Sequence, residues 1–411
     1  MPPKITAFTP DRASPQSAGT TVRWTALASD ANFDPILYRF WLKGPSTGNA
    51  WKIVQDWSTS NQWVWTSSLA DAGSYSVYVY ARDGKHAPAT GYDSAVGQTY
   101  TLSSPMTTKA LTTGSAAGAM PSLVFLGDGY LLAYQSQELG RANNGDVALQ
   151  KLDLAWNKQR TIWVASSRAN ESAPSLIAAG GNYYVAYTSE LYGNREIFVK
   201  KYDNNLRLID TKQLTSSPNN QDSPSLIATG NNFYMAYQSW DTGADSGGDI
   251  FLNKYDQNWK LVETVQLTDQ KSYQDHPSLA YANGNFYVTY ASKESGNLDI
   301  FQKKLDENLE VVETKRMTLD RSDQDYPSLK WLNDQFLLLY ASKKTGSYDI
   351  MLDRYSKDGK LIDSTAAVAA QGDQTSSSMV FSSADGMYWV AYSSKDAAGQ
   401  NIYVKPLKLT S

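Results

Sequence analysis

The sequence contains no cysteine and only two histidines, His86 and His276. The absence of cysteine excludes disulfide bonds and thiol catalysis. No apolar run reaches the roughly 20 residues that a membrane-spanning helix needs, so we expect no transmembrane segment in this chain. The formal net charge is −4, with both signs interspersed, and no basic stripe of the kind that binds nucleic acid is present. We therefore expect no nucleic-acid partner.

The first residues, MPPKITAF, do not have the pattern of a signal peptide. The location of the protein must therefore be inferred from its domains. Aromatic residues are abundant, with 27 tyrosines and 12 tryptophans, and these types suit half-buried pleated strands. With 411 residues, the chain is long enough for two or three domains. The composition favours an all-β fold.

An internal repeat of about 50 residues fills the chain from residue 105 onward. The triplet Pro-Ser-Leu starts at positions 121, 174, 224, 277 and 327, and a degenerate Ser-Ser-Met starts at 377. Each copy continues with a Tyr-x-Ser triplet and then with an acidic or amide residue before an aliphatic one. Four short strands at a period of about 40–50 residues are typical of a propeller blade; a solenoid is the alternative. The six copies predict a six-bladed β-propeller.

The ends of the repeat region predict how the ring closes. Thr112 stands nine residues before the first Pro-Ser-Leu, the place that Thr215, Thr268 and Thr318 take in later copies. The last copy ends after its third strand, at 401–409. We expect the segment at 107–112 to supply the missing outer strand of the last blade, which would remove two sheet edges.

The stretch QLTDQKSYQDHPSLAYANGNFYVTYASKESGNLDIFQKKLD (266–306) resembles the TolB-type propeller repeat. The shared pattern is Leu-Thr, then Asp, Pro-Ser, a strand ending at Ser, a Gly turn and an Asp-Ile-Tyr-like strand. The copies depart from it after the first strand, where most have Gly-Asn types instead of Ser-Pro-Asp-Gly. The resemblance covers 105–411 and implies the fold. It implies little about function, because the family spans scaffolds, binding proteins and propellers attached to hydrolases.

Residues 4–102 alternate apolar and polar side chains without this repeat, as in 22–26, 38–42 and 75–81. About seven such strands favour an immunoglobulin-like β-sandwich. In DAGSYSVYVYARD (71–83), Tyr75 is placed to hydrogen-bond back across a corner. This segment and 37–66 resemble a triple-tyrosine-like module of archaeal and bacterial surface proteins, which implies an extracellular or cell-surface location. We predict an immunoglobulin-like β-sandwich over 1–103 and a six-bladed β-propeller over 104–411.

The sequence gives little support for catalysis. It contains no Ser/His/Asp arrangement, no cluster of metal ligands, no phosphate-binding glycine loop and no Asp-box. His276 replaces a variable residue between Asp275 and Pro277, and a lone histidine of this kind is more often incidental than catalytic. Paired carboxylates in the propeller mouth remain open, because a propeller brings distant loops together.

Ligand binding is better supported by the loops expected on one face of the propeller. Several carry Gln-Asp before the triplet, and these aspartates either contact a ligand or fix the inter-blade turn through backbone amides. Two copies have three extra residues, at 137–145 and 240–248, and variable loops on a rigid scaffold often carry function. The candidate ligand-binding residues are Arg141, Asn144, Tyr192, Arg195, Asp222, Trp240, Asp241, Asp245, Asp275 and Asp325.

One segment of the first domain has the spacing of a metal-binding loop. In ASDANFDP, Asp30, Asn32 and Asp34 stand at i, i+2 and i+4, as in oxygen-rich calcium loops. No bidentate Glu follows at the EF-hand position, and a plain polar turn is the alternative. We expect that no cofactor is required, and calcium is the candidate ion.

These observations predict a non-enzymatic extracellular or cell-surface protein that binds a glycan or a surface protein on the propeller loop face. One alternative is a glycan-active enzyme of glycosidase or lyase type, with carboxylates in the propeller mouth. Another is a structural component of the envelope. An acidic pair across a deep central pocket would favour the enzyme, and a shallow aromatic surface rich in Asp and Asn would favour binding.

Overall fold

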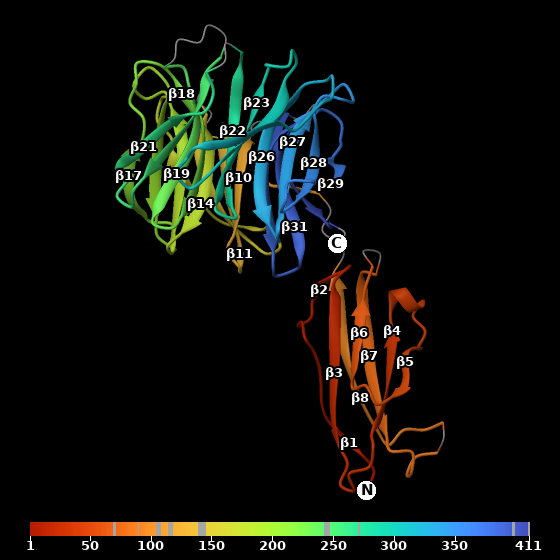
Figure 1. The fold of residues 1–411 in the computed structure, drawn as a ribbon. Coiled ribbons are helices and arrows are strands. Elements are labelled where there is room, and N and C mark those ends of the chain that lie inside the picture. Colours follow the sequence, from red (N-terminus) through yellow and green to blue (C-terminus); the bar gives the residue numbers. More distant parts are fainter. Residues whose placement is uncertain are drawn as a thin grey trace. The chain divides into compact units, whose positions relative to one another are not determined.

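The computed structural model describes residues 1–68, 71–88, 90–103, 108–113, 118–138, 145–241, 247–269, 272–396 and 399–409. Within these ranges the chain is all-β apart from one 3-10 turn, η1 (Pro45–Thr47). The chain divides into two compact units, Met1–Thr107 and Thr108–Ser411 (Figure 1). Among the described residues, no helix is long and apolar enough to cross a membrane.

The first unit has a three-stranded sheet, in the order β1-β3-β6, and a five-stranded sheet, in the order β2-β8-β7-β4-β5. Both sheets contribute to one core, in which Trp24, Phe40 and Val77 are fully buried. The Tyr75 hydroxyl donates to the Asp71 carbonyl at 2.8 Å, which is the corner bond that the sequence predicts. The strands are β1 (Lys4–Pro10), β2 (Gln16–Ser17), β3 (Thr21–Ser29), β4 (Leu37–Lys43), β5 (Lys52–Ser58), β6 (Gln62–Thr66), β7 (Gly73–Arg82) and β8 (Ser94–Ser103).

The second unit consists of six four-stranded antiparallel sheets, which we number as blades 1 to 6. The first strand of each blade contacts the first strand of the next, and β30 contacts β10, so the blades form a ring (Figure 1). Blades 1 to 3 are β10 (Gly118–Phe125), β11 (Gly129–Ser136), β12 (Asp146–Asp153), β13 (Lys158–Ala165); β14 (Glu171–Ala179), β15 (Asn182–Ser189), β16 (Glu196–Tyr202), β17 (Leu208–Gln213); and β18 (Gln221–Thr229), β19 (Asn232–Ser239), β20 (Asp249–Tyr255), β21 (Leu261–Gln266).

Blades 4 to 6 follow the same order, except that the outer strand of blade 6 comes from the start of the unit. They are β22 (Gln274–Ala282), β23 (Asn285–Ser292), β24 (Asp299–Leu305), β25 (Val311–Arg316); β26 (Gln324–Leu332), β27 (Gln335–Ser342), β28 (Asp349–Ser356), β29 (Leu361–Val368); and β30 (Asp373–Ser382), β31 (Met387–Asp396), β32 (Gly399–Leu407), β9 (Lys109–Ala110).

The ring is closed by pairing between β9 and β32, with Ala110 opposite Tyr403. Beside this pair, the Ile402 amide donates to the Thr112 hydroxyl at 2.8 Å. The equivalent bond in blade 3, from the Ile250 amide to the Thr268 hydroxyl, is 2.9 Å long. The closing blade therefore uses the same Thr contact as a blade made from one continuous segment.

The serine of the repeated triplet links neighbouring blades, which gives a physical reason for its recurrence. The Leu279 amide of blade 4 donates to the Ser225 hydroxyl of blade 3 at 2.9 Å. The same bond closes the ring, from the Leu123 amide to the Ser378 hydroxyl at 3.0 Å. It also joins blades 1 and 2, 2 and 3, and 4 and 5. Ser378 belongs to the degenerate Ser-Ser-Met copy, which keeps this serine and loses the proline.

Candidate active site

One residue in each blade has a left-handed backbone at the same place, directly before the repeated triplet. The φ angles lie between 44° and 54°, and each residue sits at a register shift between the first two strands of its blade. Such a conformation costs a non-glycine residue of order 1–3 kcal/mol, and strain of this kind clusters at functional sites. The six residues are Met120, Ala173, Ser223, His276, Tyr326 and Ser376.

These six residues line one cavity of about 130 Å³, together with the residues that follow them. All six blades contribute to it, so it lies where the first strands converge at the centre of the ring. We call this space the mouth. Its backbone is nearly the same in every blade, so any chemical difference around it must come from the side chains.

The side chains divide the mouth into two halves. Blades 3 to 5, the acidic half, have Asp222, Asp275 and Asp325 directly before the left-handed residue. Blades 6, 1 and 2, the neutral half, have Thr375, Ala119 and Ser172 there. The repeat folds with either set, so the three carboxylates are not needed by every blade.

Each of the three aspartates supports the backbone that follows it. The Oδ1 atoms of Asp222, Asp275 and Asp325 each accept the amide of the next residue at 2.7 Å. This is the backbone role that the sequence left open for them. Their expected location in loops is wrong, because β18, β22 and β26 start one residue earlier and include them.

His276 brings two of these carboxylates together. Its Nδ1 atom lies 2.9 Å from Asp325 Oδ1 and 3.6 Å from Asp275 Oδ2. Asp275 and Asp325 are only 8% and 7% exposed, whereas His276 and Tyr326 line the cavity. The rings of these two lining residues lie 4.1 Å apart between centroids. The arrangement is an imidazole that lines the mouth and lies next to two largely buried carboxyl groups.

The surroundings shift the pKa values of His276 and of the residues beside it. Burial alone lowers the pKa of His276, but the charges of Asp275 and Asp325 outweigh it and raise the pKa to about 9. Burial raises the pKa of Asp275, and the His276 charge opposes that shift. The Tyr273 hydroxyl donates to Asp275 Oδ2, and burial followed by the Asp275 charge raises the pKa of Tyr273. Displaced proton affinities in a cleft are typical of acid–base sites.

Arg195 extends the charged group toward blade 2. It follows β15 in the loop before β16, and its guanidinium lies 2.8 Å from Asp222 and 3.1 Å from Glu190. Burial opposes its positive charge, but Asp222 and Glu190 together raise its pKa. Two of the predicted ligand-binding residues, Arg195 and Asp222, are therefore brought together.

The other predicted ligand-binding residues are more scattered. Tyr192 is 66% exposed, in the same loop as Arg195. Trp240 and Asp241 follow β19, and the Asn219 side-chain amide donates to Asp241 at 3.3 Å. Arg141, Asn144 and Asp245 lie outside the described residues. A role for these loop residues stays a prediction.

His276 is the residue that sequence reasoning missed. The repeat alignment marks its position as variable, and the prediction that a lone histidine there is incidental overlooks its neighbours across the blades. The usable signal was that the variation occurs directly before the triplet in every copy. The backbone at this position is the same in every blade, but the side chain differs. Such a position can therefore form an asymmetric site at the centre of a ring of similar blades.

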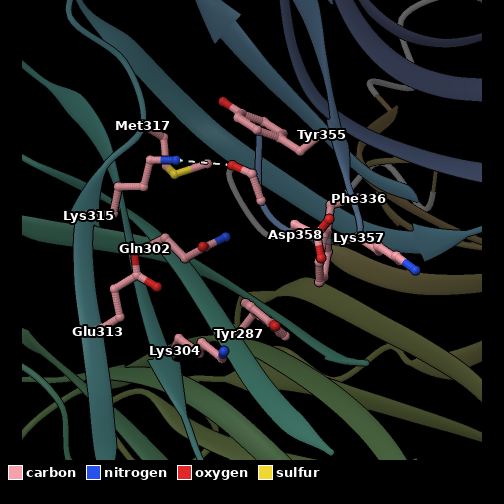
Figure 2. Close-up of a pocket in the computed structure, with 11 residues that line it drawn as sticks. Tyr287, Gln302, Lys304, Glu313, Lys315, Met317, Phe336, Tyr355, Lys357 and Asp358 are labelled. Carbon is pink, nitrogen blue, oxygen red and sulfur yellow. Dashed lines mark hydrogen bonds between the residues drawn. The ribbon is translucent and has the colours of Figure 1, made fainter. Parts of the chain in front are cut away.

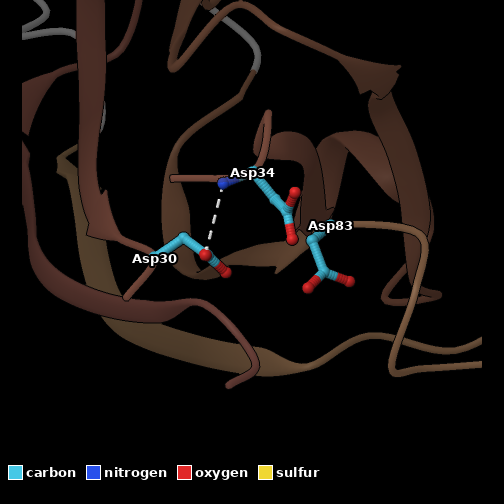
Figure 3. A group of neighbouring side chains, drawn as sticks. All are labelled: Asp30, Asp34 and Asp83. Atoms are coloured by element: carbon cyan, nitrogen blue, oxygen red, sulfur yellow. Dashed lines mark hydrogen bonds between the residues drawn. The ribbon is translucent and has the colours of Figure 1, made fainter. Parts of the chain in front are cut away.

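The predicted metal loop gains a third carboxylate in the structure (Figure 3). Asp30, Asp34 and Asp83 each offer an oxygen within 4.8 Å of the others. Asp83, which follows β7, could not be paired with this loop from the sequence. Asp30 Oδ1 accepts the amides of Asn32 and Asp34 at 2.7 and 3.3 Å, so part of the motif is a polar turn.

Two basic side chains already contact this acidic group. Lys85 Nζ donates to Asp34 Oδ1, and His86 Nδ1 lies 2.5 Å from Asp83 Oδ2. Amides of the same turn help to lower the pKa of Asp83 to about 2, against the effect of burial. One carboxylate oxygen of the group, Asp30 Oδ2, is buried and has no hydrogen-bond partner among the described residues.

A larger groove of about 390 Å³ lies between β23, β24 and β25 of blade 4 and β27, β28 and the turn after β28 of blade 5 (Figure 2). Tyr287 and Tyr355 line it with several charged side chains, and Lys315 Nζ donates to the Gly359 carbonyl at 3.2 Å. No residue lines both this groove and the mouth. Its lysines and glutamate are ordinary surface groups, so size alone does not make it the functional site.

No protein-family profile and no curated protein matches the chain. Solved structures do match. An α-L-arabinanase from Penicillium chrysogenum aligns with a TM-score of 0.57 at 12% identity, over 74% of this chain and 98% of its own. The NanB sialidase from Streptococcus pneumoniae aligns with a TM-score of 0.56 at 7% identity, over 92% and 93%. The Trypanosoma rangeli sialidase aligns at 0.52 and 11%, over 71% and 55%.

At these identities the likeness establishes a β-propeller fold. It gives no support to the TolB type or to an immunoglobulin-like first domain. It does overturn the predicted non-enzymatic binding protein, because the structures that share the fold are an arabinanase and sialidases. The enzyme alternative fits these findings better than the main prediction.

Proposed function

We propose that the protein is a glycan-active enzyme that hydrolyses glycosidic bonds in the propeller mouth. The observation that carries the proposal is the group of Asp275, His276 and Asp325, in which two buried carboxyl groups share one cavity-lining imidazole. The fold likeness to glycan-cleaving enzymes adds support.

The chemistry of glycoside hydrolysis matches this pair. Most such enzymes use two carboxyl groups, one that protonates the leaving oxygen and one that acts as base or nucleophile. The raised pKa of Asp275 suits the acid, because a buried carboxyl keeps its proton to higher pH. Asp325, hydrogen-bonded to His276, is the candidate for the second role. His276 positions both groups and faces the substrate.

Neighbouring side chains could hold a sugar against these groups. Tyr326 lines the cavity beside His276, with 4.1 Å between the two ring centroids. Sugar rings place their apolar faces on aromatic side chains and their hydroxyls on polar groups. We propose a glycan as the ligand in preference to a surface protein.

The test is a hydrolysis screen with the full chain on 4-nitrophenyl glycosides, arabinan and sialyllactose. We expect at least one substrate to be cleaved by the wild type and not by Asp275→Asn. Ser172→Ala, a change in the neutral half, is the matched control and should keep full activity. The absence of cleavage across a broad glycan panel, or equal cleavage by Asp275→Asn, would refute the proposal.

The finer assignments of the first unit also remain proposals. We propose an immunoglobulin-like fold for it, supported by its two sheets around one core and by the Tyr75 corner bond. An extracellular or cell-surface location follows from its resemblance to surface modules. For the propeller, the TolB type rests on the repeat pattern alone.

Calcium binding by the first unit is a separate proposal. Asp30 and Asp34 come from the predicted loop, and Asp83 adds a third carboxylate. The buried, unpartnered Asp30 Oδ2 supports it, because a buried carboxylate oxygen without a partner is costly. Lys85 would have to leave Asp34 when the ion binds.

A further inference from the structure

Lys330 interrupts a ring of aliphatic side chains farther along the first strands. It stands three residues after the first residue of its triplet, and its counterparts in blades 3 and 4, Ile227 and Ala280, line the same cavity. The other five copies have only aliphatic residues there, namely Val124, Ile177, Ile227, Ala280 and Val380. The fold therefore does not require a lysine at this position.

The lysine lines a cavity that is distinct from the mouth. This cavity measures about 260 Å³ and is formed by consecutive residues of β18, β22 and β26, including Ile227, Ala280 and Trp331. Lys330 comes four residues after Tyr326 on β26, which is roughly 13 Å along a strand. The two cavities thus lie at different levels of the same strands and share no lining residue.

The charge of Lys330 is not compensated within the described ranges. No aspartate or glutamate lines its cavity, and none of the described residues forms a hydrogen bond or ion pair with it. The lining residues with hydroxyl groups are Thr229 and Tyr281, and the Tyr281 hydroxyl donates to Glu307 at 3.1 Å. Burial lowers the pKa of Lys330, as expected for an ammonium in apolar surroundings.

An unpaired, part-buried cation is unfavourable unless something else in its environment pairs with it. The five aliphatic counterparts show that the fold accepts an uncharged side chain at this position, without the cost of burying a cation. A ligand with one negative charge would restore the pairing, and the apolar wall would accept its uncharged part. Apolar pockets with a single placed charge bind small molecules in this way.

We propose that Lys330 binds the carboxylate of a small ligand whose apolar body fills the cavity between β18, β22 and β26. This site is separate from the glycan site and does not depend on its activity. The competing explanation is that the aliphatic part of the Lys330 side chain covers apolar surface while its ammonium group reaches water in the cavity. In that case no anion would be selected.

Benzoate is a suitable probe, because it joins one carboxylate to a compact apolar ring. Binding to the full chain is measured by saturation-transfer NMR and by titration, with benzyl alcohol as the uncharged comparison. We expect benzoate to bind at least about tenfold more tightly than benzyl alcohol, since a charged hydrogen bond is at stake. Lys330→Met should lose that preference, and Lys330→Arg should keep it.

Lys330→Met is expected to fold, because the other blades have aliphatic residues at this position. Lys212→Met, which removes an exposed lysine of β17, is the matched control and should bind benzoate as the wild type does. The proposal is overturned if the wild type shows no preference for benzoate over benzyl alcohol. It is equally overturned if Lys330→Met binds benzoate with unchanged affinity.

Discussion

The two halves of the propeller mouth have the same backbone and different side chains. In both halves a left-handed residue precedes the triplet, with φ near 50°. In the acidic half an aspartate comes before that residue, and Ser223, His276 and Tyr326 occupy the left-handed position. In the neutral half these places hold small, polar or thioether side chains. The propeller therefore shows how a repeat that is uniform for folding becomes asymmetric for chemistry.

This comparison separates residues that build the ring from residues that act in it. The serine of the triplet bonds the next blade in both halves. The Thr contacts between the outer strands also recur, in the closing blade as in blades 2, 3 and 4. The aspartates of the acidic half take part in charged contacts between blades, such as Asp325 with His276, and Asp222 also pairs with Arg195 of blade 2.

Substitutions at equivalent left-handed positions should affect activity very differently in the two halves. His276→Ala in the acidic half should lower kcat/KM by about 100-fold or more, because Asp275 and Asp325 would lose the imidazole that positions them for proton transfer. Ser376→Ala in the neutral half should change it by less than about twofold. Steady-state kinetics on the substrate found in the screen gives both numbers. Similar losses in both variants would mean that the mouth acts as a whole.

The charge of His276 should also make stability depend on pH. Its pKa is about 9 in the folded protein against 6.5 ordinarily. Its protonation therefore stabilises the fold fully below pH 6.5, and the effect is lost as the pH rises from 6.5 to 9. The loss should be about 1–3 kcal/mol. Asp275, Asp325 and Tyr326 lie next to it, and the charge of Asp222 also raises its pKa.

Urea unfolding at pH 6.5 and pH 9 measures this change. His276→Gln, which cannot titrate, should lose less stability over the same interval. If wild type and variant lose stability in parallel, His276 is not held between two carboxylates as described.

Removing the serines that link the blades should destabilise the protein equally in both halves. Ser225→Ala in the acidic half removes the acceptor of the Leu279 amide, and Ser378→Ala in the neutral half removes that of Leu123. Each should cost about 1–2 kcal/mol of unfolding free energy, with little effect on kcat. A large loss of activity in only one of them would place that serine in the chemistry.

The smallest expected effect lies in the first unit and leaves the mouth untouched. In the full chain, calcium at millimolar concentration should raise the melting temperature of the first unit by a few degrees. A ligand that binds only the native state stabilises it. Asp83→Asn should weaken the rise, and sodium at equal ionic strength should not reproduce it. Equal melting with and without calcium would leave Asp30 and Asp34 as a polar turn.

The repeat predicted much of the fold because its spacing reflects a local unit that each copy builds in the same way. Thr112 was a usable marker of ring closure for the same reason. The site was harder to predict. His276 meets Asp325 only through the packing of neighbouring blades, and Asp83 reaches Asp30 only through the folding of the first unit. The sequence marked the carboxylates but could not show that a histidine joins them.

The most direct test of the account measures binding and turnover together in Asp325→Asn. If the mouth performs chemistry, kcat should fall by about 100-fold or more while the affinity for the glycan, measured by calorimetry, stays within about threefold of the wild type. The substitution keeps the size of the side chain and an oxygen that can accept the Tyr326 amide. Unchanged kcat in this variant, or a wild type that binds glycan without ever cleaving it, would contradict the account.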